Sequence, residues 1–343
     1  MDEPEPSVRS SKQLLIASRA FASEQRFNSW KHLILTIAAL VALFAVARSP
    51  LYWWLRLPFS VMAGMVIIRC YILFHDHAHG AILRRSKIAN CIMFAYGLAA
   101  LSPPSVWKRT HDQHHRNNSR TLNPNVGSFP LLTIEEYAAA SRMNRFHYHV
   151  SRHPLTIALA YFTVFLFGLC IQPIIESPRR HFDALLSLIV HFSLMWLLCA
   201  NLSDVFLVWL IPFGTAAAMG AYLFFAQHNF PSAKFYSATE WDYVFAALHS
   251  SSYIAMGPIM NWFTGNIGYH HVHHLNEKIP FYRLPEAMAA IDELKCPAST
   301  SLRPRDMLAC LRLKLLDPKT GHLIAWPSAA AKTEANAAGV TKI

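Results

Sequence analysis

The sequence predicts an all-α integral membrane protein in which four transmembrane helices carry a cytoplasmic helical cap. Three observations lead to this fold class. The chain has 343 residues, of which 53% are hydrophobic and only 15% charged, whereas a soluble globular protein carries roughly 25% charge. The apolar residues form long blocks instead of amphipathic stripes, which is typical of membrane helices. Histidine-rich clusters follow several of these blocks, so polar groups gather near the expected helix ends.

Six apolar stretches are candidates for membrane helices. They cover residues 33–47, 51–74, 88–101, 155–175, 184–200 and 205–226. A spanning helix needs about 20 residues, with a range of ~17–25. The first stretch is short, but Trp30 and Lys31 precede it as interface anchors. The third is too short to cross and ends before Pro103 and Pro104, so we expect an interfacial or re-entrant segment there.

A parity argument gives the topology. The histidine clusters follow the second, third and sixth stretches, so they form one site only if all three lie on one side of the membrane. The loop 176–183 carries two arginines and is expected in the cytoplasm, while the loop 201–204 carries no basic residue and suits the far side. Stretch 155–175 then becomes a re-entrant or surface helix pair, broken near Gly168 or Pro173. Four crossings remain, with both termini in the cytoplasm; the alternative counts 155–175 as a crossing and demotes another stretch.

The remaining parts of the chain fit around this membrane unit. We expect an N-terminal cytoplasmic segment over residues 1–29, a membrane domain over residues 30–326 and a disordered tail over residues 327–343, which is rich in alanine and lysine. Within the domain a helix is expected around residues 133–145. Arg69 lies in an apolar stretch, where a charge is costly, and is expected to face the interface near the cytoplasmic end.

Histidines recur at helical spacing in three clusters. Their sequences are HDHAH at 75–79, HDQHH at 111–115 and HHVHH at 270–274, and His228 ends the last apolar stretch. Helical periodicity places the two outer histidines of the first cluster on one face, because they are four residues apart. In the second and third clusters, histidines at positions i, i+3 and i+4 put three imidazoles on one face.

This pattern is specific, and it points to metal binding. At the histidine frequency of this chain, 19 in 343, one H-x-x-H-H pattern arises by chance in roughly one chain in twenty and two in roughly one in several hundred. Imidazole suits iron, zinc, copper and nickel, but eight or nine histidines exceed what one four-coordinate zinc uses. Two metals with about four nitrogens each fit the number. Together with the membrane context, this ligand count favours a di-iron site in the cap.

Other polar side chains in or near the clusters have expected roles as well. Metal-bound imidazoles usually donate their second N–H to a carboxylate, a carbonyl or water. Asp76 and Asp112 lie inside clusters and are expected to accept such bonds, and Asn266 is expected to hold a metal-bound water. His77 and His271 point off the ligand face, so we expect neither to bind metal.

These clusters and their flanks resemble the membrane fatty acid desaturase family, in particular bacterial acyl-lipid desaturases of the delta-12 and delta-5 type. The likeness runs from about residue 30 to residue 295. The segments that carry it are FHDHAHG, VWKRTHDQHHRNNS, LLTIEEYAAASRMNRFHYHVSRHP, FFAQHNF and WFTGNIGYHHVHHLNEKIPFYRLPEA.

The resemblance implies a function and a set of ligands. It implies O₂ as the oxidant and a double bond in a fatty acyl chain, carried by a membrane lipid, as the product. No H-P-G-G haem-binding segment is present, so electrons would come from a separate ferredoxin or cytochrome with its reductase. The implied location is the bacterial inner membrane, with the active site in the cytoplasm. The implied ligands of two iron ions are His75, His79, His111, His114, His115, His228, His270, His273 and His274.

Other functions remain open from the sequence. A hydroxylase or ketolase that inserts oxygen into a lipid, alkane or carotenoid shares the ligands and differs in product, and the wider resemblance favours desaturation over it. A membrane metal transporter would place ionisable ligands near the bilayer midplane, whereas these histidines lie at helix ends and in loops. The net charge of +11 suits cytoplasmic loops facing anionic lipid. The basic residues form no stripe, so no nucleic-acid partner is expected.

Overall fold

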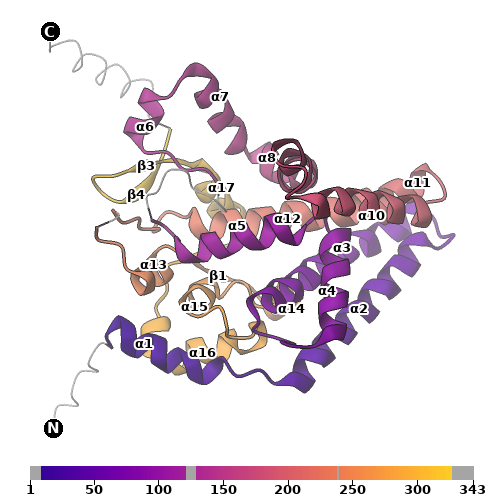
Figure 1. The fold of residues 1–343 in the computed structure, drawn as a ribbon, viewed down its shortest axis with the longest axis horizontal. Helices are drawn as coiled ribbons and strands as arrows, with labels where there is room; N and C mark the ends of the chain where they lie inside the picture. The colour runs from indigo at the N-terminus through magenta and orange to yellow at the C-terminus, as the bar shows by residue number, and fades with distance from the viewer. Residues whose placement is uncertain (1–8, 121–128, 238, 327–343) are drawn as a thin grey trace.

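The computed structural model describes residues 9–120, 129–237 and 239–326, and these are mostly helical. Long helices α2, α3 and α10 extend to the right of Figure 1, whereas the short elements α1, α13, α15 and α16 gather on the left. The tail predicted over residues 327–343 lies outside the described residues.

Two long apolar helices form an antiparallel hairpin, α2 (Arg26–Arg48) and α3 (Trp53–His79). Helix α3 continues without interruption from its apolar part into the first histidine cluster. It ends because Gly80 takes the left-handed conformation, with φ +71°, and its N–H bonds to the carbonyl groups of Asp76 and His77. The last turn of a membrane helix therefore carries the first histidines.

Another long helix, in addition to α2, packs along α3. It consists of α11 (Leu202–Asp204), the π-helix η3 (Val205–Leu210) and α12 (Ile211–His228), which follow one another directly. The contact with α3 is close at Gly64, where a Cβ atom would lie 2.6 Å from the Pro212 carbonyl oxygen. Only glycine allows this approach, which brings the end of α12 beside the end of α3.

Three helices among the described residues are long and apolar enough to cross a membrane: Arg26–Arg48, Trp53–His79 and Leu202–His228. Of the four crossings expected from the sequence, the structure therefore supports three by length and composition. The fifth stretch forms α10 (Phe182–Leu198), with 17 residues. The third forms α4 (Lys87–Ala99), which has 13 residues and packs against α10.

Stretch 155–175 differs from its expected form. It contains α8 (Pro154–Ala158), the π-helix η2 (Tyr161–Ile171) and α9 (Gln172–Glu176). The break expected near Gly168 or Pro173 is wrong, because η2 runs directly into α9 as one helix over Tyr161–Glu176. Pro173 lies where the π-helix η2 passes into α9, and it does not interrupt the helix. The chain turns instead between α8 and η2.

The helix expected around residues 133–145 is in fact two helices, α6 (Ile134–Ala139) and α7 (Arg142–Ser151). The first ends at Ala140, whose backbone is extended with ψ 145°. The second begins because the Ser141 side chain accepts a hydrogen bond from the Asn144 N–H. A capping serine within the apparent helical pattern therefore divides it.

Arg69 does not face the membrane interface, as expected from the sequence, but is buried, with 3% of its surface exposed. Its Nε atom donates to Thr36 Oγ1 of α2 at 3.1 Å, and its Nη1 atom donates to the Trp262 carbonyl oxygen. The guanidinium also lies over the Trp262 ring, 4.4 Å from its centroid. These partners offset the cost of burying the charge and join α3 to the cap.

We call the remaining short elements the cap. Its helices are α1 (Ser11–Ser18), η1 (Arg19–Phe21), α5 (Pro104–Arg116), α13 (Tyr243–His249), α14 (Pro258–Phe263), α15 (His270–Leu275), η4 (Phe281–Arg283), α16 (Leu284–Ala290), η5 (Asp292–Leu294) and α17 (Pro304–Arg312). Four short strands were not predicted. They are β1 (Tyr253–Ala255), parallel to β2 (Ser299–Ser301), and β3 (Leu313–Asp317), antiparallel to β4 (His322–Ala325).

Candidate metal centre

Nine histidines from four helices meet between the membrane helices and the cap. Each is at most 8% exposed. Helix α3 contributes two of them, α5 three, α12 one and α15 three. They are His75, His79, His111, His114, His115, His228, His270, His273 and His274.

A tight turn brings α15 to this cluster. Gly265 has φ +52°, and a Cβ atom there would lie 2.8 Å from Ile72 Cγ2 of α3. The next residue, Asn266, also has a positive φ, of +55°, and its Nδ2 atom donates to the Phe281 carbonyl oxygen at 3.1 Å. The structure thus gives the Asn266 amide a contact with cap backbone, whereas the sequence suggested a water-holding role.

The nine histidines divide into two groups, and each group could hold one metal ion. In both groups all the candidate ligand nitrogens lie within 4.8 Å of one another. We call them the five-histidine group and the four-histidine group. The first consists of His75, His79, His111, His115 and His273, and the second of His114, His228, His270 and His274.

Helices α5 and α15 each contribute to both groups. Histidines at positions i and i+4 lie about 40° apart around a helix, whereas those at i+3 and i+4 lie about 100° apart. His111 and His115 therefore belong together, and His114 turns to the other group. In α15, His270 and His274 are four residues apart and belong to the four-histidine group, whereas His273 belongs to the five-histidine group. The sequence predicted one shared face, but that face serves two sites.

The ligand nitrogens converge closely in the five-histidine group. The Nε2 atoms of His79 and His111 are 3.0 Å apart, those of His111 and His115 are 3.1 Å apart, and those of His115 and His273 are 3.2 Å apart. In the four-histidine group, the Nε2 atom of His270 lies 2.9 Å from that of His228 and 3.0 Å from that of His274.

Burial and mutual proximity keep the cap imidazoles neutral. Burial, followed by the neighbouring imidazoles, lowers the pKa of six of them well below 6.5. A neutral imidazole has one nitrogen lone pair for a cation. The six are His111, His114, His115, His270, His273 and His274.

This arrangement fits metal ions. His228 Nδ1 lies 3.0 Å from the Ser250 carbonyl oxygen, so it carries the proton and leaves the Nε2 lone pair facing His270. The five-histidine group offers five nitrogens, one more than a four-coordinate zinc uses. The four-histidine group offers four nitrogens.

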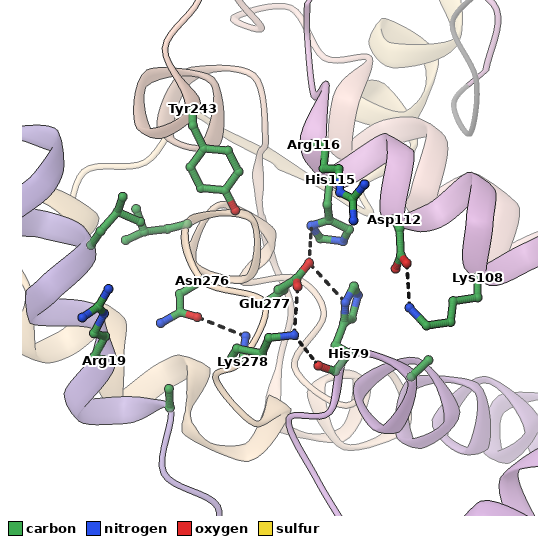
Figure 2. Close-up of a pocket in the computed structure, with 14 residues that line it drawn as sticks. Arg19, His79, Lys108, Asp112, His115, Arg116, Tyr243, Asn276, Glu277 and Lys278 are labelled. Carbon is green, nitrogen blue, oxygen red and sulfur yellow. Dashed lines mark hydrogen bonds and ion pairs between the residues drawn. The ribbon is translucent and has the colours of Figure 1, made fainter. Parts of the chain in front are cut away.

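Two carboxylates contact imidazoles of the five-histidine group. Asp76 is 1% exposed, and its Oδ1 atom lies 3.0 Å from His75 Nδ1. Glu277, which sequence reasoning missed, places Oε2 3.2 Å from His79 Nδ1 and 3.8 Å from His115 Nδ1 (Figure 2). Glu277 follows the third cluster by three positions, so a search for acids just outside the clusters would have found it.

Charge near Glu277 keeps it ionised. Burial alone would raise the pKa of this carboxyl group, but contacts with His79 and with the Lys278 ammonium, at 3.1 Å, outweigh burial and lower it to about 2. Lys278 Nζ also donates to the His79 carbonyl oxygen at 2.6 Å. A permanent anion therefore lies at the outer edge of the five-histidine group.

The structure places Asp112, His77 and His271 away from the ligand nitrogens, as the sequence predicted for the two histidines but not for Asp112. Asp112 pairs with Lys108 on the surface of α5, with Oδ2 and Nζ 2.6 Å apart, so the structure does not bring it to an imidazole. His77 Nε2 lies 2.8 Å from Asn90 Oδ1. His271 is buried, but its Nε2 atom faces the Leu294 carbonyl oxygen at 3.2 Å. Both of these histidines lie outside the two groups.

A polar cavity reaches the cluster from the cap side. It has a volume of about 580 Å³, and His79 and His115 form part of its wall (Figure 2). Six of its lining residues are charged: Arg19, Lys108, Asp112, Arg116, Glu277 and Lys278.

An apolar cavity reaches the cluster from the membrane helices. It has a volume of about 680 Å³, and its lining includes His75, His111 and His270. The remaining wall is mainly aliphatic and aromatic and comes from α3, α4, α5, η2 and α12. Trp107 lines it and stacks on His111, with ring centroids 4.7 Å apart.

Fold and site together define a class of protein. It is a helical protein with three helices, among its described residues, long and apolar enough to cross a membrane, in which two groups of buried imidazoles that could hold metal ions lie beside an apolar cavity. The sequence model of the family described as fatty acid desaturase matches residues 51–303. The chain belongs to the fatty acid desaturase family, which confirms the family indicated by the histidine clusters, and it is an oxidoreductase.

Individual relatives agree with this assignment. The chain is 29% identical over 327 residues to a fatty acid desaturase of Bacillus subtilis, covering 92% of this chain and 90% of the relative. It is 24% identical to the sn-1 oleoyl-lipid 12-desaturase of a Picosynechococcus species, covering 85% and 84%. It is 23% identical to a chloroplastic sn-2 acyl-lipid omega-3 desaturase (ferredoxin) of Arabidopsis thaliana, covering 77% and 61%.

Proposed function

We propose that this enzyme introduces a cis double bond into a fatty acyl chain of a membrane lipid, with O₂ as the oxidant at a di-iron site. The observation that carries this proposal is the apolar cavity. It touches the five-histidine group through His75 and His111 and the four-histidine group through His270. Its volume of about 680 Å³ lies within the range of roughly 300–1,000 Å³ usual for ligand sites.

The nine histidines are the proposed iron ligands, five for one ion and four for the other. When bound, iron supplies the redox chemistry that side chains lack, because acid–base groups do not break an unactivated C–H bond. The reaction balances when two hydrogens leave adjacent chain carbons and two electrons and two protons arrive from a donor. These reduce one O₂ to two waters, and the alkene remains.

The protein's own part is to orient imidazoles and exclude water. Asp76 and Glu277 are proposed to fix the rings of His75 and His79 from their Nδ1 side, since ligand orientation depends on such partners. Trp107 is proposed to hold the His111 ring by stacking. The apolar wall is proposed to exclude water from the space in which the acyl chain lies next to the imidazoles.

We propose that a separate acidic electron carrier, a ferredoxin or a cytochrome with its reductase, docks over the polar cavity. His79 and His115 line this cavity, so a bound carrier would come close to the five-histidine group. The rim includes the exposed Lys108 and Arg116, which would attract an acidic surface. One relative's name includes ferredoxin.

We also propose four membrane crossings in a bacterial inner membrane, with α10 as the fourth and the cap in the cytoplasm. The 17 residues of α10 lie at the lower limit of ~17–25 for a spanning helix. In this proposal residues 1–29 are a cytoplasmic segment and residues 30–326 form one domain. The described part of this segment contacts the rest of the cap, since Asn276 Nδ2 donates to Ser18 Oγ at 3.0 Å. An active periplasmic reporter fused to the C-terminus would overturn this topology.

Gas chromatography–mass spectrometry of total fatty acids tests the function. A host expressing the protein should contain a new unsaturated acyl species, and a host expressing His114→Ala should not. Derivatisation then gives the position of the double bond. A hydroxylated species would replace the proposal with oxygen insertion. Iron-loaded protein that yields no product with reduced donor and several acyl lipids would refute it.

A further inference from the structure

One face of α12 lines the apolar cavity along most of the helix. Cavity-lining residues recur along it at spacings of three and four, at Phe213, Ala217, Gly220, Phe224 and Gln227. From the first to the last of these positions the helix rises about 21 Å. One leaflet of a bilayer holds acyl chains in a hydrocarbon layer of about 15 Å, half of the ~30 Å core. The cavity is therefore long enough for an extended long-chain acyl group.

Gly220 lies in the middle of this face. A Cβ atom at Gly220 would meet no atom of the described residues within 4 Å. Glycine is thus not required there for close helix packing, as it is at Gly64, nor for a positive φ. Within a helix it costs roughly 0.5–1 kcal/mol relative to alanine. The space that Gly220 leaves is part of the cavity, so the residue keeps the cavity continuous at its midpoint.

We propose that Gly220 determines the longest acyl chain that can place its reacting carbons at the histidines. Gly220 is about 10 Å from Gln227 along the helix, and α12 ends at His228 of the four-histidine group. A branched side chain at this point would divide the cavity into a part next to the histidines and a part beyond. This inference rests on the proposed function and adds a determinant of chain length to it.

The same helix offers a matched control. Gly214 lies on α12, and a Cβ atom there also meets no atom of the described residues within 4 Å. It is not among the residues that line the apolar cavity. Gly214→Leu therefore adds the same side chain to the same helix and leaves the cavity unchanged.

The experiment compares wild type, Gly220→Leu, Gly220→Ala and Gly214→Leu. Each is expressed in a host that is fed lauroyl, myristoyl, palmitoyl and oleoyl chains, and products are measured by gas chromatography–mass spectrometry. Iron content and binding of the same fatty acids to the purified proteins are measured in parallel. We expect Gly220→Leu to bind and convert the longest chains roughly tenfold less or worse, since a clash of 1.4 kcal/mol corresponds to tenfold. Shorter chains and iron content should be retained.

The outcomes separate the inference from the proposed function. A wild type that makes no unsaturated product refutes the function. A productive wild type with Gly220→Leu and Gly214→Leu giving the same chain-length profile refutes the inference. Should Gly220→Leu lose its iron, Gly220→Ala decides: a profile moved toward shorter chains supports the inference, and an unchanged profile refutes it.

Discussion

The two cavities beside the histidine cluster have similar volumes and opposite chemistry. The polar cavity, of about 580 Å³, is lined by charged residues of the cap, including three from α5. The apolar cavity, of about 680 Å³, lies among membrane helices. The five-histidine group contributes to both walls, through His79 and His115 on one side and His75 and His111 on the other. The four-histidine group lines the apolar cavity through His270.

This difference indicates that the five-histidine group is accessible from both cavities, whereas the four-histidine group is accessible from the apolar cavity. The polar cavity gives charged species a path to the five-histidine group, and in the proposed function the apolar cavity gives acyl chains a separate path to both groups. Hydrocarbon and solvent would otherwise compete for one entrance. The following predictions test this difference in access, beginning with the largest effect.

Removing one ligand from either group should abolish turnover. We expect His114→Ala and His273→Ala each to lower product formation by more than about 100-fold, a larger loss than the 10–100-fold typical of residues behind the ligands. Mass spectrometry of fatty acids and membrane-fraction immunoblots provide the measurement. His77→Ala, outside both groups, serves as the control and should remain active. Wild-type turnover by either ligand variant would contradict the ligand assignment.

Glu277 should matter to metal binding, and Asp112 should not, although both line the polar cavity. Glu277→Gln removes the charge beside His79 and should weaken iron binding by about 10–100-fold. Asp112→Asn removes a charge paired with Lys108 and should leave it unchanged. Iron retained during titration with a chelator distinguishes the two. Equal iron affinities in both variants would show that Glu277 does not contribute to metal binding.

The two groups should lose metal at different rates. Only the five-histidine group contributes described residues to the polar cavity, so a hydrophilic chelator should extract one of two irons several times faster than the other. Saturation with a long-chain fatty acid should slow the second phase and spare the first. Absorbance of the chelate followed over time gives both phases. A single phase accounting for both ions would refute separate access.

Charge reversal at the rim of the polar cavity should have the smallest effect. Arg19→Glu combined with Arg116→Glu is expected to lower turnover several-fold with an acidic protein donor at low salt. The difference should shrink as salt screens the charges. Turnover with a small uncharged reductant should not change. Arg305→Glu, an exposed charge outside the cavity, is the control, and an equal loss in it would argue against docking at the rim.

Helical spacing and apolar runs predicted the long helices and the histidine ligands, which are features with a repeating sequence pattern. All nine histidines predicted as ligands fall within the two groups. The division into two groups was missed, because we treated the three histidines of α5 as one face. His114 and His115 differ by ~100° of rotation about the helix axis. Glu277 was missed because it lies beyond the end of α15, where periodicity no longer applies. The partners of Arg69 lie on α2 and α14, distant in sequence, so no local pattern could indicate them.

The length of α3 has a consequence for the energetics of substrate exchange. Its 27 residues rise about 40 Å, roughly 10 Å more than the hydrocarbon core of a bilayer. A helix of this length can cross the core and still extend about two turns beyond it, so the final turn, with His75 and His79, can lie outside the hydrocarbon while the helix spans it. A methylene group that moves from lipid into the apolar cavity passes between two apolar environments. The transfer therefore lacks the ~0.8 kcal/mol that a methylene group gains when it leaves water. Hydrophobicity therefore favours neither entry nor retention, and the product can return to the bilayer with little penalty.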